Sequence, residues 1–247
     1  MDSVLPKLNG KKKICIICEG AEEYDYINRL ISLNVWHYQY HIHLINAEEN
    51  GNLVSRYQNE YQIGRYDIIF IICDTEKKPY KQFDAICNAI NEFHDSFYAS
   101  QSVIIFTNPC TMQAILLHFD HTIRLNKPSK KHSAPYITTY TGVENYSGKE
   151  KERNAVMDCL TVDNYKYMME HINMLSTDPY ELNSSNIGIY WNYFESSNSD
   201  WVKYINRTIE LSEDEYDICV ADEAYKEYVN SGKQSRSIEA LWKELNL

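Results

Sequence analysis

The chain has 247 residues, of which 44% are hydrophobic, and a formal net charge of −11. This length suits one large domain, or one domain with an extension, whose core folds without disulfides or metals. No apolar run reaches the roughly 20 residues that cross a bilayer, and the N-terminus lacks the apolar segment of a signal peptide, so we expect a cytoplasmic protein. The acidic charge disfavours general nucleic-acid binding, although a local basic patch or a bound metal can reverse the field at one site.

Strand-like and helix-like segments alternate along the first half of the chain. The apolar or alternating runs predict strands at 13–18, 40–45, 67–73 and 102–106. The amphipathic runs predict helices at 22–33, 53–61, 80–93 and 110–119. This order predicts an α/β fold, with a mostly parallel four-stranded sheet flanked by helices.

The pattern changes after about residue 125. A polar, basic loop is expected at 126–133, and residues 183–186 have the composition of a linker. Further helices are expected at 154–175, 201–209, 222–229 and 237–245. We therefore expect an α/β domain over residues 1–125 and a mainly helical C-terminal region over 126–247 packed on it.

The cysteines predict no metal site of their own. Cys15 and Cys18 have the CxxC spacing of half a zinc knuckle, but no second pair completes such a site. Because residues three apart on a strand point to opposite faces, we expect packed thiols instead.

Acidic residues follow two of the predicted strands. Glu19 comes directly after the first, while Asp74 and Glu76 follow the most apolar one, DIIFIIC. Ligands of parallel α/β sheets gather beyond the carboxyl ends of the strands, so neighbouring strands would bring these carboxylates together. Like charges that close repel one another unless a cation neutralises them, and Mg²⁺ or Mn²⁺ suits such ligands. Capping of the next helix is the alternative role for these acids.

Three blocks of sequence resemble motifs of Toprim-like proteins. IICEGAEEYDYINRL resembles the first motif, a strand that ends in Glu-Gly, and IFIICDTEKK resembles the Asp-x-Asp motif after a central strand. FTNPCTMQAILLHF resembles a block typical of the RloB/AbiLii-like branch, and the blocks occur in the family's order over roughly half the chain. The resemblance implies a Toprim-like, metal-dependent nuclease of a bacterial anti-phage or abortive-infection system. It also implies Mg²⁺ or Mn²⁺ as cofactor, an ATPase as partner, and DNA or RNA, tRNA included, as substrate.

The resemblance also implies roles for individual acids. It makes Glu19, Asp74 and Glu76 catalytic carboxylates that hold the metal, with Glu19 also a candidate general base. Glu23, which opens the next helix, is a further metal ligand by the same resemblance. Glu76 stands where the family usually has Asp, and its side chain reaches one methylene further.

One departure from the branch leaves an alternative open. The branch usually has Phe-Glu after Asn-Pro-Cys, where this chain has Thr111 and Met112. If that Glu binds metal or substrate, Met112 removes it. The alternative is a non-catalytic, Toprim-like interaction subunit of an ATPase defence complex. A nucleotide-binding sensor has little support, because no glycine-rich phosphate loop is present.

Five residues are candidates for substrate binding: Lys77, Lys78, Asn108, Lys130 and Lys131. The lysines could contact phosphates, and the alternative is that they are solvated, as short charge runs usually are. Asn108 could point into the site or, with the following proline, shape the turn into the next helix.

Two other features of the sequence have weaker functional interpretations. Cys110 and His118 are expected to be a packed thiol and a structural histidine rather than catalytic groups. The acidic, tyrosine-rich segment 209–228 could contact the ATPase; an ordinary solvated helix pair is the alternative.

Overall fold

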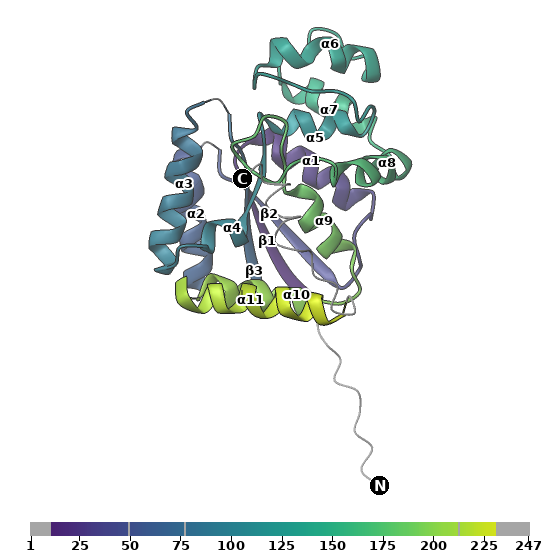
Figure 1. Ribbon diagram of the computed structural model, residues 1–247. Helices are drawn as coiled ribbons and strands as arrows, with labels where there is room; N and C mark the ends of the chain where they lie inside the picture. Colours follow the sequence, from purple (N-terminus) through teal and green to yellow (C-terminus); the bar gives the residue numbers. More distant parts are fainter. Residues whose placement is uncertain (1–10, 49, 77, 212, 231–247) are drawn as a thin grey trace, which may run out of the picture.

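The chain folds around a parallel β-sheet (Figure 1). The structure, a computed structural model, describes residues 11–48, 50–76, 78–211 and 213–230. Within these ranges, the four strands are β1 (Lys12–Cys18), β2 (Tyr40–Asn46), β3 (Ile68–Asp74) and β4 (Ile104–Thr107). They lie in the order β2-β1-β3-β4, and every pair is parallel. The predicted fold class, an α/β fold with a parallel four-stranded sheet flanked by helices, is confirmed.

Helices cover both faces of this sheet (Figure 1). One layer contains α1 (Ala21–Ser32), α5 (Thr111–Leu117) and α9 (Ile187–Glu195), and the other contains α2 (Asn50–Ile63) and α3 (Lys81–His94). Because both faces are covered, the central strands are apolar throughout: residues 14–18 of β1 are fully buried.

The C-terminal part of the described chain is helical, as predicted. Its further helices are α6 (Lys130–Thr141), α7 (Glu150–Asp158), α8 (Val162–Ile172), α10 (Asp200–Ile209) and α11 (Glu213–Asn230). The expected helix 154–175 is divided into α7 and α8, because Thr161 caps α8 by accepting a hydrogen bond from the Asn164 amide, 3.3 Å away. The expected helix 237–245 lies outside the described residues. No helix in the described ranges is both long and apolar enough to span a membrane.

Two predicted boundaries are wrong. The strand expected at 102–106 begins only at Ile104, because Ser102 and Val103 belong to a short helix, α4 (Ala99–Val103). The basic loop expected at 126–133 ends at Ser129, whose side chain caps α6. Lys130 and Lys131 therefore lie in the first turn of a helix.

Residues 183–186, expected to be a linker, pack against the edge of the sheet. Ser185 forms an antiparallel bridge with Thr107 of β4. The Asn186 side chain accepts a hydrogen bond from the Phe106 amide and donates one to the Ile104 carbonyl, both at 2.8 Å. This segment satisfies backbone groups at the edge of β4 and so joins the C-terminal part to the sheet.

We expect Asn186→Ala to lower the free energy of unfolding by about 2–6 kcal/mol, because it leaves two buried backbone groups of β4 unpaired at about 1–3 kcal/mol each. Chemical denaturation followed by circular dichroism measures this loss. Asn192→Ala, a substitution of the same kind at an exposed position of α9, is the control. Equal stability of the two variants would show that the 183–186 segment does not hold the sheet edge.

Candidate functional site

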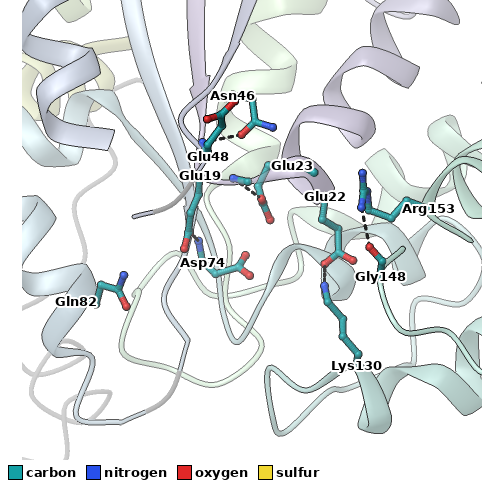
Figure 2. Close-up of a pocket in the computed structure, with 12 residues that line it drawn as sticks. Glu19, Glu22, Glu23, Asn46, Glu48, Asp74, Gln82, Lys130, Gly148 and Arg153 are labelled. Atoms are coloured by element: carbon teal, nitrogen blue, oxygen red, sulfur yellow. Dashed lines mark hydrogen bonds and ion pairs between the residues drawn. The ribbon is translucent and has the colours of Figure 1, made fainter. Parts of the chain in front are cut away.

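A hollow lies at the carboxyl edge of the sheet, beside the ends of β1 and β3 (Figure 2). The chain leaves β1 toward β2 on one side and later returns to β3 on the other, so the connection reverses direction between these two strands. Ligands of open α/β sheets bind at such switch points. The hollow has a volume of about 690 Å³, and its acidic lining is Glu19, Glu22, Glu23, Glu48 and Asp74. We call it the acidic hollow.

Glu19 and Asp74 meet because β1 and β3 are paired. The Glu19 amide donates to the Ile72 carbonyl at 3.0 Å, which continues the ladder past the end of β1. The Glu19 Oε2 then accepts a hydrogen bond from the Asp74 amide at 2.7 Å. The structure thus brings together these two predicted acids, one from each strand end.

The Asp74 carboxylate is held by two threonines, one at the end of β4 and one at the start of α5. Its Oδ1 accepts hydrogen bonds from the Thr111 amide at 2.6 Å, the Thr111 hydroxyl at 2.9 Å and the Thr107 hydroxyl at 3.1 Å. Thr111 is the first residue of α5, so the positive end of this helix dipole also faces the carboxylate. The hydrogen bonds to Asp74 from the described residues go to Oδ1, and Oδ2 remains as the oxygen that a cation could bind.

Glu23 enters the acidic hollow from the first turn of α1. Its Oε2 accepts a hydrogen bond from the Gly20 amide at 3.0 Å, and its side chain is 5% exposed. A Cβ at residue 20 would lie 3.3 Å from the same oxygen, so glycine allows this close approach. Figure 2 shows the carboxylates of Glu23 and Asp74 turned toward one another.

The carboxylates raise one another's pKa values. Burial raises the pKa of Asp74 well above its ordinary value, and the neighbouring carboxylates of Glu23, Glu19 and Glu22 raise it further. Burial, followed by the charge of Glu22, likewise raises the pKa of Glu23. The site therefore concentrates more negative charge than its surroundings neutralise, which favours binding of a cation.

Basic side chains from the C-terminal part flank the acidic hollow. Glu22 forms an ion pair with Lys130 of α6 and accepts a hydrogen bond from the Tyr146 hydroxyl. Arg153 of α7 pairs with Asp25 of α1 at 2.6 Å. These contacts fix α6 and α7 over the carboxyl edge of the sheet and place two cations beside the acids (Figure 2).

The donor set of Glu19, Glu23 and Asp74 fits a hard divalent cation. All three supply carboxylate oxygens, which Mg²⁺ and Mn²⁺ prefer, and like charges in a partly buried site gain from a shared cation. Within the described ranges, no group of three or more His, Cys, Asp and Glu side chains has the spacing of a ready-made metal site. The chemistry and charge of these acids, rather than a preformed geometry, therefore favour a metal.

The structure places the remaining predicted site residues elsewhere. Glu76 does not line the acidic hollow; with Lys78 it lines a neighbouring one of about 740 Å³. Lys131 lines a third hollow, of about 550 Å³, to which Lys130 also contributes. The Asn108 side chain is fully buried and donates to the Pro179 carbonyl at 2.8 Å. Lys77 lies outside the described residues.

Cys110 and His118 lie in buried surroundings that suit structural rather than catalytic roles. Burial raises the pKa of the Cys110 thiol well above its ordinary value. His118 is 1% exposed, its Nε2 lies 3.0 Å from the Tyr26 hydroxyl, and burial lowers its pKa to about 3. A thiol that stays protonated and an imidazole that stays neutral are poor candidates for a nucleophile and its base.

Several residues of the site were not predicted from the sequence. Asn46 is the last residue of β2 and Glu48 comes two residues later, so the rule applied to the other strand ends could have found them. Glu22, in the first turn of α1, was not assigned to the site from the sequence, although it lines the acidic hollow. Thr111 carries no signal in the sequence, because its role depends on where α5 begins relative to β3.

Comparisons with known proteins give no further guidance: no family model, no curated protein and no solved structure matches the chain.

Proposed function

We propose that the protein is a nuclease that depends on Mg²⁺ or Mn²⁺ and hydrolyses phosphodiester bonds of DNA or RNA. The observation that carries this proposal is the convergence of Glu19, Glu23 and Asp74 on one hollow at the switch point of the sheet. A divalent cation held by these carboxylates would polarise the phosphate and lower the pKa of a bound water. The resemblance of the sequence motifs to Toprim-like proteins supports the same chemistry.

The residues of the chain have distinct roles in this proposal. Glu19 accepts the proton of the attacking water, since its carboxylate is beside Asp74 at the centre of the site. Asp74 is oriented for cation binding by Thr111 and Thr107. Lys130, beside the acids on the side of α6, offers a positive charge to the phosphate. Glu76, which lines a different hollow, has no metal-binding role in the proposal.

A non-catalytic interaction subunit is the second candidate function. Met112 favours it, because the RloB/AbiLii-like branch usually has Glu at this position, and here the Met112 side chain is 1% exposed within the core. Its burial on α5 supports a packing role for this residue. Thr111, the neighbouring residue, nevertheless retains its hydrogen bonds to Asp74.

Incubation of the purified protein with single-stranded and duplex DNA and RNA, with Mn²⁺ or with EDTA, tests the proposal. We expect cleavage that requires Mn²⁺ or Mg²⁺. Absence of metal-dependent cleavage from every nucleic acid, in a protein that is folded by circular dichroism, would leave the interaction subunit as the better account.

We also propose, from the resemblance, that the protein works in a bacterial anti-phage system with an ATPase bound through its C-terminal part. The side chains of Ile218 and Tyr225 on α11 are 63% and 64% exposed. Exposed large apolar side chains of this kind are expected at a surface that a partner protein covers. A C-terminal truncation that tests this contact should begin at residue 213, because Ile209 and Leu211 are buried and belong to the packed structure.

Co-expression with the product of a neighbouring ATPase gene tests this partnership. We expect the full chain to co-purify with the ATPase and the chain truncated after residue 212 to lose it. Retention of the ATPase by a folded truncated protein would show that α11 is not the contact.

A further inference from the structure

We propose that β2 is an interface at which two copies of the protein pair, antiparallel and edge to edge, so that their two sheets form one continuous sheet. β2 is the outermost strand on one side of the sheet, and among the described strands its neighbour is β1 (Figure 1). This inference concerns assembly and does not rest on the proposed nuclease function. It follows from the backbone groups of β2, from the composition of the strand and from the charges at its two ends.

The outward-facing backbone groups of β2 belong to alternate residues. The Lys12 amide donates to the Gln39 carbonyl at 2.9 Å, and in a parallel ladder every second residue bonds to the same neighbouring strand, so the odd-numbered residues face β1. The amides of Ile42, Leu44 and Asn46 therefore point away from the sheet. No residue in the described ranges accepts a hydrogen bond from these three amides. The edge thus offers donors and acceptors to another extended chain.

The two edges of the sheet differ in their protection. At β4 the edge is closed by residues 183–186, which bond to its backbone groups. The seven residues of β2, YHIHLIN, include no Lys, Arg, Asp, Glu or Pro, and they keep an unbroken register with β1. The side chains of His41 and His43 are exposed, and those of Ile42 and Leu44 are half-buried. A long edge strand without charges, proline or a bulge favours pairing with another strand.

A second copy of β2 fits this edge by symmetry. Two identical strands that pair about a two-fold axis are antiparallel. His43 is the middle residue of β2, so an axis beside it lets the whole strand pair. Ile42 of each copy then exchanges backbone hydrogen bonds with Leu44 of the other, and His43 lies opposite itself. The half-buried side chains of Ile42 and Leu44 gain cover from one another across the interface.

The charges at the two ends of β2 are complementary in this arrangement. Lys11 and Lys13 are exposed and lie at the amino end, where β1 begins beside β2. Glu48 is exposed and follows the carboxyl end, where it lines the acidic hollow. Antiparallel pairing brings the amino end of each copy toward the carboxyl end of the other, so opposite charges approach at both ends of the interface. This complementarity favours a second copy of the chain as the occupant.

Cysteine cross-linking tests the register directly. Cα atoms of a non-hydrogen-bonded antiparallel pair lie about 4.5 Å apart, which a disulfide can bridge. We therefore expect His43→Cys to give a disulfide-linked dimer on mild oxidation. The matched control is His41→Cys on the same face of β2, because its two copies would be about 14 Å apart, four residues along the strand, and could not be bridged.

Wild-type protein oxidised alongside measures any linkage through the native cysteines. Equal linkage of the two variants above this level, or none of His43→Cys, would overturn the inference.

Sedimentation velocity over a dilution series tests whether the dimer forms without a cross-link. We expect the wild type to sediment as a dimer that dissociates on dilution. His43→Lys should remain a monomer, because two like charges would lie directly opposite one another. His43→Gln, which stays neutral, and Asn88→Lys, which adds the same charge at an exposed position of α3, should both keep the dimer. A wild type that is monomeric at every concentration, or a dimeric His43→Lys, would contradict the proposal.

Hydrogen exchange of single amides identifies the edge that pairs. In monomeric His43→Lys the amides of Ile42 and Leu44 should exchange rapidly, whereas those of His41 and Ile45, which face β1, should exchange slowly and so show that the sheet is intact. In the wild-type dimer both sets should exchange slowly. Slow exchange of Ile42 and Leu44 in a monomer would mean that another segment of the same chain covers the edge, and the proposal would fail. None of these measurements depends on cleavage of nucleic acid.

Discussion

Glu19→Gln is expected to lower the rate of metal-dependent cleavage by about 10²–10⁴-fold, the usual contribution of a general base. The substitution keeps an oxygen that can accept the hydrogen bond from the Asp74 amide, so the end of β1 should remain in place. It removes the charge and the basic site, which a nuclease needs and a scaffold does not. The measurement is the single-turnover cleavage rate with saturating Mn²⁺ and a labelled oligonucleotide.

The matched control for this variant is Glu170→Gln. Glu170 lies on an exposed position of α8, so the same chemical change is made away from the acidic hollow. It should cleave at the wild-type rate, and thermal unfolding should show both variants folded. Unaltered cleavage by folded Glu19→Gln would exclude Glu19 as the base.

Metal-free protein is expected to lose stability as the pH rises from about 4 toward neutrality, and Asp74→Asn should remove much of this loss. The folded-state pKa of Asp74 is raised, chiefly by burial, so the folded protein holds this proton more tightly than the unfolded chain does. The stability that protonation of Asp74 contributes to the folded state is fully present below the ordinary pKa of an aspartate. It is lost as the pH rises through the raised pKa. Each unit of difference in pKa corresponds to about 1.4 kcal/mol.

The Asn variant isolates this effect. Its amide oxygen can accept the hydrogen bonds from Thr111 and Thr107, while its N–H group can donate to the nearby carboxylates. At neutral pH in EDTA we expect the melting temperature of Asp74→Asn to exceed that of the wild type by at least about 3 °C, because 1 kcal/mol corresponds to about 2–4 °C at this chain length. Mg²⁺ should stabilise the wild type and leave the variant unaffected.

A lower melting temperature for Asp74→Asn in EDTA at neutral pH would contradict this account. It would mean that the Asp74 charge is already neutralised by other groups in the metal-free protein. A cation would then gain little by binding, and the carboxylates would be structural.

The sequence predicted the centre of the site because two signals coincide there. The buried runs that became β1 and β3 are too apolar for any position but the middle of a parallel sheet. Once those strands are neighbours, Glu19 and Asp74 must lie at the same edge. The pairing itself is a tertiary feature, and only the structure shows it.

The prediction was less complete where the backbone turns. Glu76 has a φ of +59°, and it lines the neighbouring hollow that includes Lys78 rather than the acidic one, which spacing along an extended strand would not suggest. Asn186 looked like part of a linker because its composition is polar, yet its amide pairs with two backbone groups of β4. Such contacts join residues about eighty positions apart, and local patterns carry no information about them.

Crystals of the protein soaked in Mn²⁺ would show whether the carboxylates of Glu19, Glu23 and Asp74 hold a divalent cation. Anomalous diffraction locates manganese independently of any assay of activity. We expect a peak in the acidic hollow within about 2.0–2.6 Å of carboxylate oxygens of Asp74 and at least one of the two glutamates, the range of oxygen ligation by hard divalent cations. Absence of a peak there at saturating Mn²⁺, or a peak only at other carboxylates, would contradict it.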